Sequence, residues 1–129
     1  MARVILVVGA TGAGKTTYAG KLADELGALR FSIDEWMGPL FAKDSPQPIQ
    51  FEWMMERIGR CEAMMLTLVS QAARRGVPSV LDLGFTKREH REAIAAACAD
   101  AGYVSAIHFV DGDSTVRWER VKKRNLEQG

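Results

Sequence analysis

The segment GATGAGKTT, residues 9–17, limits what this chain can fold into more than any other stretch. It satisfies the spacing G-x-x-x-x-G-K-[ST] through Gly9, Gly14, Lys15 and Thr16. The apolar run VILVV precedes it and is typical of a strand buried on both faces, and a helical pattern over residues 15–26 follows it. A glycine-rich loop between a strand and a helix is the context in which this motif holds phosphate.

The chemistry of this loop explains why these residue types are needed. Glycines let the main chain curl with its N–H groups pointing inward around an anion, and the helix that begins near Lys15 adds its positive N-terminal end. We expect Lys15 to reach the β- and γ-phosphates of a nucleotide and the Thr16 hydroxyl to ligate Mg²⁺. The expected nucleotide-binding residues are Gly9, Ala10, Thr11, Gly12, Ala13, Gly14, Lys15, Thr16 and Thr17. The alternative is a glycine-rich turn without a ligand, and the complete motif with both flanks argues against it.

The rest of the chain alternates short apolar runs with longer helical patterns, which predicts an α/β fold of parallel strands with right-handed crossovers. Further strands are predicted over residues 29–33, 79–83 and 104–110, and further helices over 49–75 and 86–102, with a last helix from 113 or 114. Residues 37–48 hold three of the four prolines and are predicted to form a mobile loop. The long helix carries one apolar stripe, formed by Phe51, Met54, Ile58, Cys61, Met65, Leu68 and Ala72.

Length and composition restrict the class of protein. A chain of 129 residues, 47% hydrophobic and 26% charged, is predicted to be one domain, residues 1–129, with its own core. A net charge of +1 gives no general attraction to nucleic acid or membranes, and no run approaches the ~20 apolar residues of a membrane helix. Cys61 and Cys98 lie in apolar helical patterns, so we interpret them as reduced core residues of a cytoplasmic protein.

Four segments together carry a resemblance to a known family. They are GATGAGKTT, FSIDEW, VLDLGF and RWERVKKRN, in that order along the chain. With them the chain resembles the P-loop kinases, and more narrowly the zeta-toxin-like, chloramphenicol-phosphotransferase-like and polynucleotide-kinase-like enzymes. The resemblance implies a three-layer α/β/α P-loop NTPase fold with a parallel sheet of strand order 2-3-1-4-5. It also implies transfer of the γ-phosphoryl group of ATP.

The C-terminal part departs from the pattern that this resemblance implies. In this family a lid segment that folds over the transferring phosphate is expected near the C-terminus. The chain ends at Gly129, within or just after this expected lid, and its sequence supplies no fifth strand. A truncated polypeptide, a naturally short form, and a protomer whose sheet edge is completed by a neighbour are three explanations. An uncovered strand edge tends to recruit a partner, so a homodimer is one expectation.

Two aspartates follow predicted strands. Asp34 ends the second strand, and ligands of open parallel sheets bind outside the carboxyl ends of the strands, so it is expected at the same edge as the phosphate-binding loop. There Asp34 could accept a proton from a substrate hydroxyl or orient that hydroxyl for attack. In the resembling enzymes an aspartate at this place serves as the base. The alternative is that Asp34 caps a helix. Asp82 ends the third strand and could hold Mg²⁺ directly or through a water, the alternative being an acidic residue at a strand end without a ligand.

Three arginines, Arg117, Arg120 and Arg124, share one face of the last predicted helix. The resemblance makes this the start of a lid whose arginines fold over the transferring phosphate, where developing negative charge needs a clamp. We therefore expect a catalytic role for Arg120 and Arg124 beside Lys15 and Asp34. A solvated basic face is the alternative.

The sequence says less about the acceptor. Tryptophans and methionines before and within the long helix could form an adaptable apolar pocket or belong to the core: Trp36, Met37, Trp53, Met54, Met55, Met64 and Met65. The segment DEWMGP lacks the arginine that some relatives place there, which argues against a nucleotide or nucleic-acid acceptor. His90 and His108 are given no role.

Three functions are compatible with these features. The first is a kinase that uses ATP and Mg²⁺ to phosphorylate a hydroxyl of a small-molecule acceptor. The second is a toxin-like kinase acting on a sugar nucleotide, which a basic acceptor pocket would favour. The third is a nucleotide-binding module without catalysis.

Overall fold

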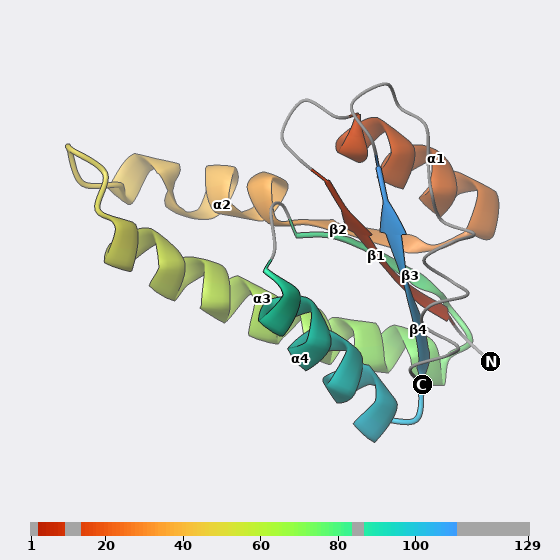
Figure 1. Cartoon of the computed structure of the whole chain (residues 1–129). Helices are drawn as coiled ribbons and strands as arrows, with labels where there is room; N and C mark the ends of the chain where they lie inside the picture. The colour runs from red at the N-terminus through yellow and green to blue at the C-terminus, as the bar shows by residue number, and fades with distance from the viewer. Residues whose placement is uncertain (1–2, 10–13, 84–86, 111–129) are drawn as a thin grey trace.

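The structure is a computed structural model, and it describes residues 3–9, 14–83 and 87–110. The described elements include one helix more than predicted, α2, between the second strand and the long helix (Figure 1). Their order is β1 (Arg3–Val8), α1 (Lys15–Leu26), β2 (Leu29–Ser32), α2 (Ile33–Phe41), a 3₁₀ turn (Ala42–Asp44), α3 (Phe51–Arg74), β3 (Ser79–Asp82), α4 (Arg88–Asp100) and β4 (Val104–Phe109). Among the helices that the structure describes, none has both the length and the hydropathy of a membrane span.

The four strands within these residues form one parallel sheet in the order β2-β3-β1-β4. This confirms the predicted order of the first four strands. β1 lies between β3 and β4, and its residues from Val4 to Val8 are all buried, as the continuous apolar run predicted. The predicted last helix and the question of a fifth strand concern residues after 110, outside the described part of the chain. The homodimer stays a prediction.

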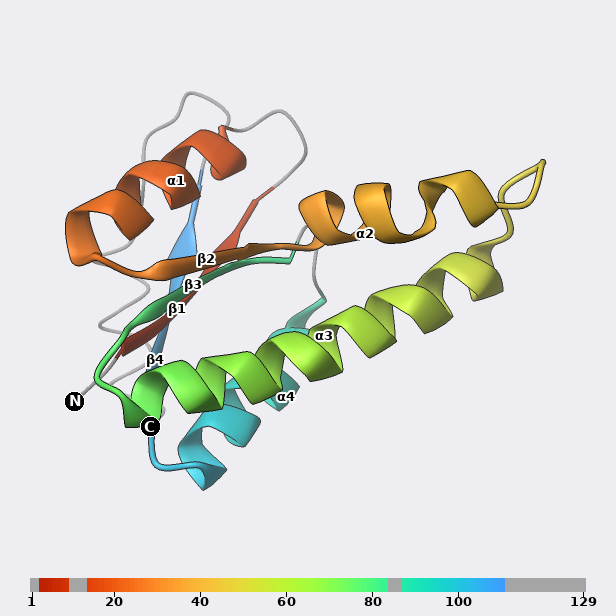
Figure 2. The same ribbon diagram turned by 180° about the vertical axis from the view of Figure 1, so that it is seen from behind.

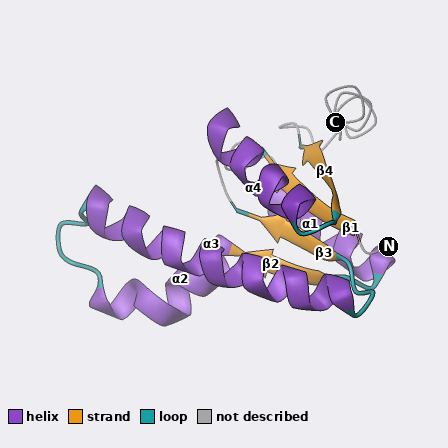
Figure 3. Cartoon of the chain, turned by 90° about the horizontal axis from the view of Figure 1, so that it is seen from below, coloured by secondary structure: helices purple, strands orange, loops and turns teal. Residues whose placement is uncertain are grey.

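Helices cover both faces of the sheet, which confirms the three-layer α/β/α architecture (Figures 1 and 3). Alternate residues of a strand point to opposite faces. On one face, Ala19 of α1 packs against the residues of β1 that include Ile5. On the other face, Met65 of α3 and Ile94 of α4 pack against the residues of β1 that include Leu6.

The segment after β2 departs most from the sequence-based expectation. β2 ends one residue earlier than predicted, and α2 then runs from Ile33 to Phe41, although a loop was predicted from residue 37 onward. Pro39 lies inside this helix and cannot donate a hydrogen bond there. Ile33 is buried and Trp36 and Phe41 pack against the core, so apolar contacts at helical spacing compensate for the missing bond.

α2 and the first half of α3 run side by side and project away from the sheet as an arm (Figures 1 and 2). α3 itself was predicted within two residues at each end. Phe51 was predicted to belong to the apolar stripe, but it is 74% exposed because the first turn of α3 lies in the arm, beyond the sheet. The stripe residues Cys61, Met65 and Ala72 lie further along the helix and are buried.

Candidate functional site

Asp82 meets the phosphate-binding loop directly. The Lys15 Nζ lies 3.4 Å from Asp82 Oδ1, and the Thr16 hydroxyl donates a hydrogen bond of 3.2 Å to Asp82 Oδ2. The lysine and aspartate side chains are only 10% and 4% exposed. Residues 66 positions apart in the chain thus form one polar cluster at the carboxyl end of β3.

The N-terminus of α1 presents main-chain N–H groups without a side-chain cap among the described residues. Gly14 precedes the helix with φ 85° and ψ 15°, a left-handed conformation that glycine adopts without strain. Among the described residues no side chain caps this end, and the first turn carries no acidic residue. The first N–H groups of a helix have no partner within the helix, so this end adds hydrogen-bond donors and partial positive charge next to Lys15.

Gly9 has a steric reason to be glycine. A Cβ at this position would lie 2.7 Å from the carbonyl oxygen of Val110, much closer than such atoms approach. The Val110 N–H donates to the Val8 carbonyl, which fixes the end of β4 against the start of the loop. Gly9 therefore lets β1 enter the phosphate-binding loop while staying in contact with its neighbouring strand.

A row of side chains crosses the sheet at the level of Asp82. In the strand register Ser32 of β2 is opposite Asp82, and Val7 of β1 is opposite both Asp82 and His108 of β4. His108 is buried, and its Nδ1 shares a hydrogen bond of 2.6 Å with the Tyr18 hydroxyl. Burial raises the pKa of Tyr18, and the negative charge of Glu25 adds to the effect. Sequence reasoning missed this pair, although a histidine inside the apolar run VSAIHFV was a signal of a buried polar contact.

Asp34 was predicted to end a strand. The structure places it in the first turn of α2 instead. Its side chain is exposed and makes no hydrogen bond or ion pair with another described residue. The helix cap is Ser32, whose hydroxyl accepts a hydrogen bond of 3.4 Å from the Glu35 N–H, so the cap interpretation of Asp34 is wrong. Asp34 follows Ser32 by two residues, which keeps it near the edge of the sheet where Asp82 ends β3.

Some predicted site residues lie outside the described part of the chain. These are four residues of the phosphate-binding loop and the lid arginines: Ala10, Thr11, Gly12, Ala13, Arg117, Arg120 and Arg124. Thr17 is described, as an exposed residue in the first turn of α1.

The tryptophans and methionines do not form one pocket. Trp36 and Met37 pack against the core, and Met65 is buried in it. Met55 and Met64 are 46% and 56% exposed. The interpretation as core residues therefore holds for Trp36, Met37 and Met65, and not for the exposed Met55 and Met64.

Comparisons with known proteins agree with this geometry. A profile of a family described as AAA domain matches residues 4–129. The chain belongs to the AAA domain family. Together with the strand order and the Lys15–Asp82 contact, this makes it a P-loop kinase-like NTPase, as the sequence resemblance implied. No curated protein is significantly similar to this AAA domain in sequence.

Several solved structures share the fold of this AAA domain. An unliganded sugar kinase from Janibacter sp. HTCC2649 matches with a TM-score of 0.63 and 21% identity, over 100% of this chain and 69% of its own. A mutant of the Mycobacterium tuberculosis APS kinase CysC matches with a TM-score of 0.60 and 19% identity, over 88% of this chain and 78% of its own. A chain of the Pnkp1/Rnl/Hen1 complex matches with a TM-score of 0.63 and 16% identity, over 95% of this chain and 38% of its own. At these identities the likeness is one of fold.

Proposed function

We propose that this protein is an ATP-dependent phosphotransferase that moves the γ-phosphoryl group of ATP to a hydroxyl of a small-molecule acceptor. The observation that carries the proposal is the cluster of Lys15, Thr16 and Asp82 beside the uncapped start of α1. A nucleoside triphosphate and its metal ion require a cation, a hydroxyl and a carboxylate close together. This cluster provides one of each at the carboxyl end of a central strand.

The donor set fits Mg²⁺. Thr16 and Asp82 present a hydroxyl and a carboxylate oxygen to the same place, and Mg²⁺ is usually held by one or two carboxylates together with phosphates and waters. Thr16 and Asp82 would hold the ion, which when bound neutralises negative charge on the phosphates. When the nucleotide binds, the Lys15 ammonium would leave Asp82 and contact the phosphates. This step needs only the residues of this chain.

The proposed transfer is an in-line displacement. A bond forms between the acceptor oxygen and the γ-phosphorus, the bond from that phosphorus to the bridging oxygen breaks, and ADP leaves. The hydroxyl proton passes to the Asp34 carboxylate. Its exposed position without a described partner leaves this carboxylate free to meet a substrate. Arg120 and Arg124 are proposed to bind the charge that develops on the phosphoryl group.

The test is ATP consumption against a panel of hydroxylated metabolites, antibiotics and sugar nucleotides. Asp34→Asn should keep its ATP affinity within about threefold and lower transfer at least about 100-fold, the usual contribution of a general base. Asp44→Asn is the matched control because Asp44 is an exposed aspartate at the far end of the arm. Lys15→Ala should lose both binding and transfer.

The same panel separates the alternatives. Stimulation by a sugar nucleotide alone would favour the toxin-like reaction. ATP binding with no stimulation by any acceptor, and no effect of Asp34→Asn, would favour a nucleotide-binding module and contradict the proposal.

A further inference from the structure

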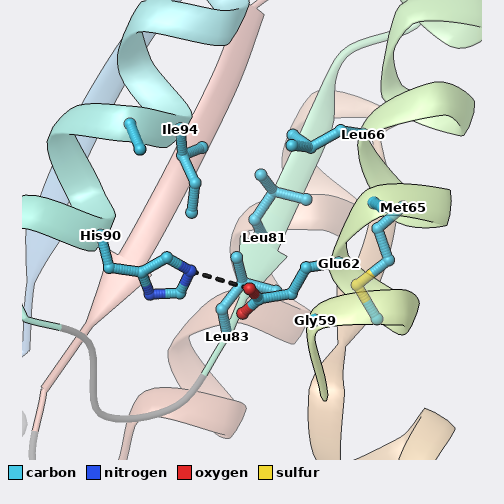
Figure 4. Close-up of a pocket in the computed structure, with 10 residues that line it drawn as sticks. Gly59, Glu62, Met65, Leu66, Leu81, Leu83, His90 and Ile94 are labelled. Atoms are coloured by element: carbon cyan, nitrogen blue, oxygen red, sulfur yellow. Dashed lines mark hydrogen bonds and ion pairs between the residues drawn. The ribbon is translucent and has the colours of Figure 1, made fainter. Parts of the chain in front are cut away.

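A cavity of about 250 Å³ lies between α3 and α4, against the end of β3 (Figure 4). Most of its wall is apolar, with Met65, Leu66 and Ile94 from the helices and Leu81 and Leu83 from the strand side. Its volume is about eight times the share of one water molecule in the liquid, so it suits part of a small organic molecule.

Glu62 brings a carboxylate into this apolar wall. One of its oxygens, Oε1, lies 2.8 Å from His90 Nε2 across the cavity, and Figure 4 shows the two side chains reaching toward each other from α3 and α4. Since a carboxylate oxygen only accepts, the histidine nitrogen is the donor. The other oxygen, Oε2, is buried and has no hydrogen-bond partner among the described residues.

An unpaired buried carboxylate oxygen is unfavourable, and native structures contain few such atoms. The last torsion of a glutamate side chain is soft, so a small rotation can turn Oε2 toward the cavity. The Glu62 side chain is 14% exposed and lines the cavity. A ligand that donates an N–H or O–H bond there would satisfy this oxygen.

The cavity and the phosphate site meet at the end of one strand. Leu81 and Leu83 line the cavity, whereas Asp82 between them contacts Lys15 on the other face of the sheet. Both places lie at the carboxyl end of β3, where ligands of open parallel sheets bind. A molecule anchored in the cavity could extend around this end toward the phosphate-binding loop.

We infer that this cavity holds the apolar part of the phosphoryl acceptor and that Glu62 binds its ammonium group, which makes the acceptor a small apolar amino alcohol. The inference rests on the proposed function. An ammonium is favoured over a neutral donor because it also compensates the negative charge of the Glu62 carboxylate, which is mostly buried in an apolar wall. The same carboxylate repels anionic acceptors, so a sugar nucleotide or a nucleic-acid end does not fit this site.

Binding is measured by calorimetry without nucleotide, using benzylammonium, benzyl alcohol and benzoate, which share one ring and differ in charge. Benzylammonium should bind most tightly and benzoate not at all. Glu62→Gln keeps the shape of the side chain and an acceptor for His90, and should weaken benzylammonium at least about tenfold while changing benzyl alcohol less than about threefold. Glu56→Gln is the matched control, because Glu56 lies on the same helix in an exposed pair with Arg60.

Transfer is then tested with 2-amino-1-phenylethanol. Glu62→Gln should raise its KM at least about tenfold with little change in kcat, and Glu56→Gln should change neither. Equal binding of the three probes, or equal benzylammonium affinity in both variants, would overturn the site. An unchanged KM would overturn its assignment to the acceptor. Failure of the proposed function looks different: benzylammonium would still bind through Glu62, yet no acceptor would be phosphorylated.

Discussion

Asp82→Asn tests the contact on which the phosphate site depends. The carboxylate and the Lys15 ammonium are almost completely buried, at 4% and 10% exposure. Removing one partner of a buried ion pair costs about 3–5 kcal/mol because the other charge stays without compensation. Lys15 begins α1 and can turn toward water, so we expect the lower end, a loss of about 3 kcal/mol in the free energy of unfolding. At this chain length that corresponds to a fall in Tm of about 10 °C.

The assay is urea unfolding followed by circular dichroism, with Glu92→Gln as the control. Arg88 and Glu92 form an ion pair with a shorter distance, 2.9 Å, but their side chains are 73% and 63% exposed. Exposed pairs contribute about 0–1 kcal/mol, so the control should change little. Burial and not distance then explains the difference between the two variants.

Nucleotide gives a second measurement on the same variant. ATP phosphates would return a negative partner to Lys15, so ATP without Mg²⁺ should raise the Tm of Asp82→Asn more than that of the unaltered protein. If Asp82→Asn is no less stable than Glu92→Gln, the contact between Lys15 and Asp82 stabilises the fold no more than an exposed ion pair does.

The remaining predictions concern glycines and thiols. Gly9→Ala would place a Cβ 2.7 Å from the Val110 carbonyl oxygen, so we expect a loss of about 1–3 kcal/mol in urea unfolding; an unchanged midpoint would refute the close contact. Gly59 lies in α3 where an added Cβ meets no atom within 4 Å, so Gly59→Ala should raise the free energy of unfolding by about 0.5–1 kcal/mol through helix propensity; a loss would show a steric conflict. Burial raises the pKa of the thiols of Cys61 and Cys98, which lowers their thiolate fraction. Iodoacetamide at pH 8 should therefore modify neither in the folded protein and both in urea, as mass spectrometry can determine; rapid labelling of the folded protein would contradict their burial.

The sequence predicted the central part of the site because its signals are local. Gly9, Gly14, Lys15 and Thr16 lie within one short motif, and two apolar stretches, VILVV ending at Val8 and VLDL around Asp82, marked buried strands. Parallel strands place their carboxyl ends at one edge, and the strand order that the resemblance implied places the third strand beside the first, so Asp82 was expected near the loop.

The arm was predicted less well because two local signals conflicted. Pro39 and the prolines after it argued for a loop, while Ile33, Trp36 and Phe41 had helical spacing. Packing on the core decided in favour of the helix. The prediction of Asp34 at a strand end failed for the same reason, since the chain turns into α2 directly after Ser32.

Pairs formed across the fold could not be predicted from the sequence. Glu62 and His90 are 28 positions apart on different helices, and Tyr18 and His108 are 90 positions apart. Their contacts depend on how α3 packs against α4 and how α1 packs against the sheet. Each of these residues taken alone is compatible with an ordinary surface or core position.

The most direct test of the account is calorimetric titration of ATP into the protein in magnesium buffer, with Lys15→Ala as the comparison. We expect saturable binding of one ATP per chain and a loss of at least about tenfold in affinity in the variant, since a charged hydrogen bond to phosphate is removed. Absence of binding by the unaltered protein, or equal affinity of the two proteins, would contradict the assignment of residues 9–17 as the nucleotide site.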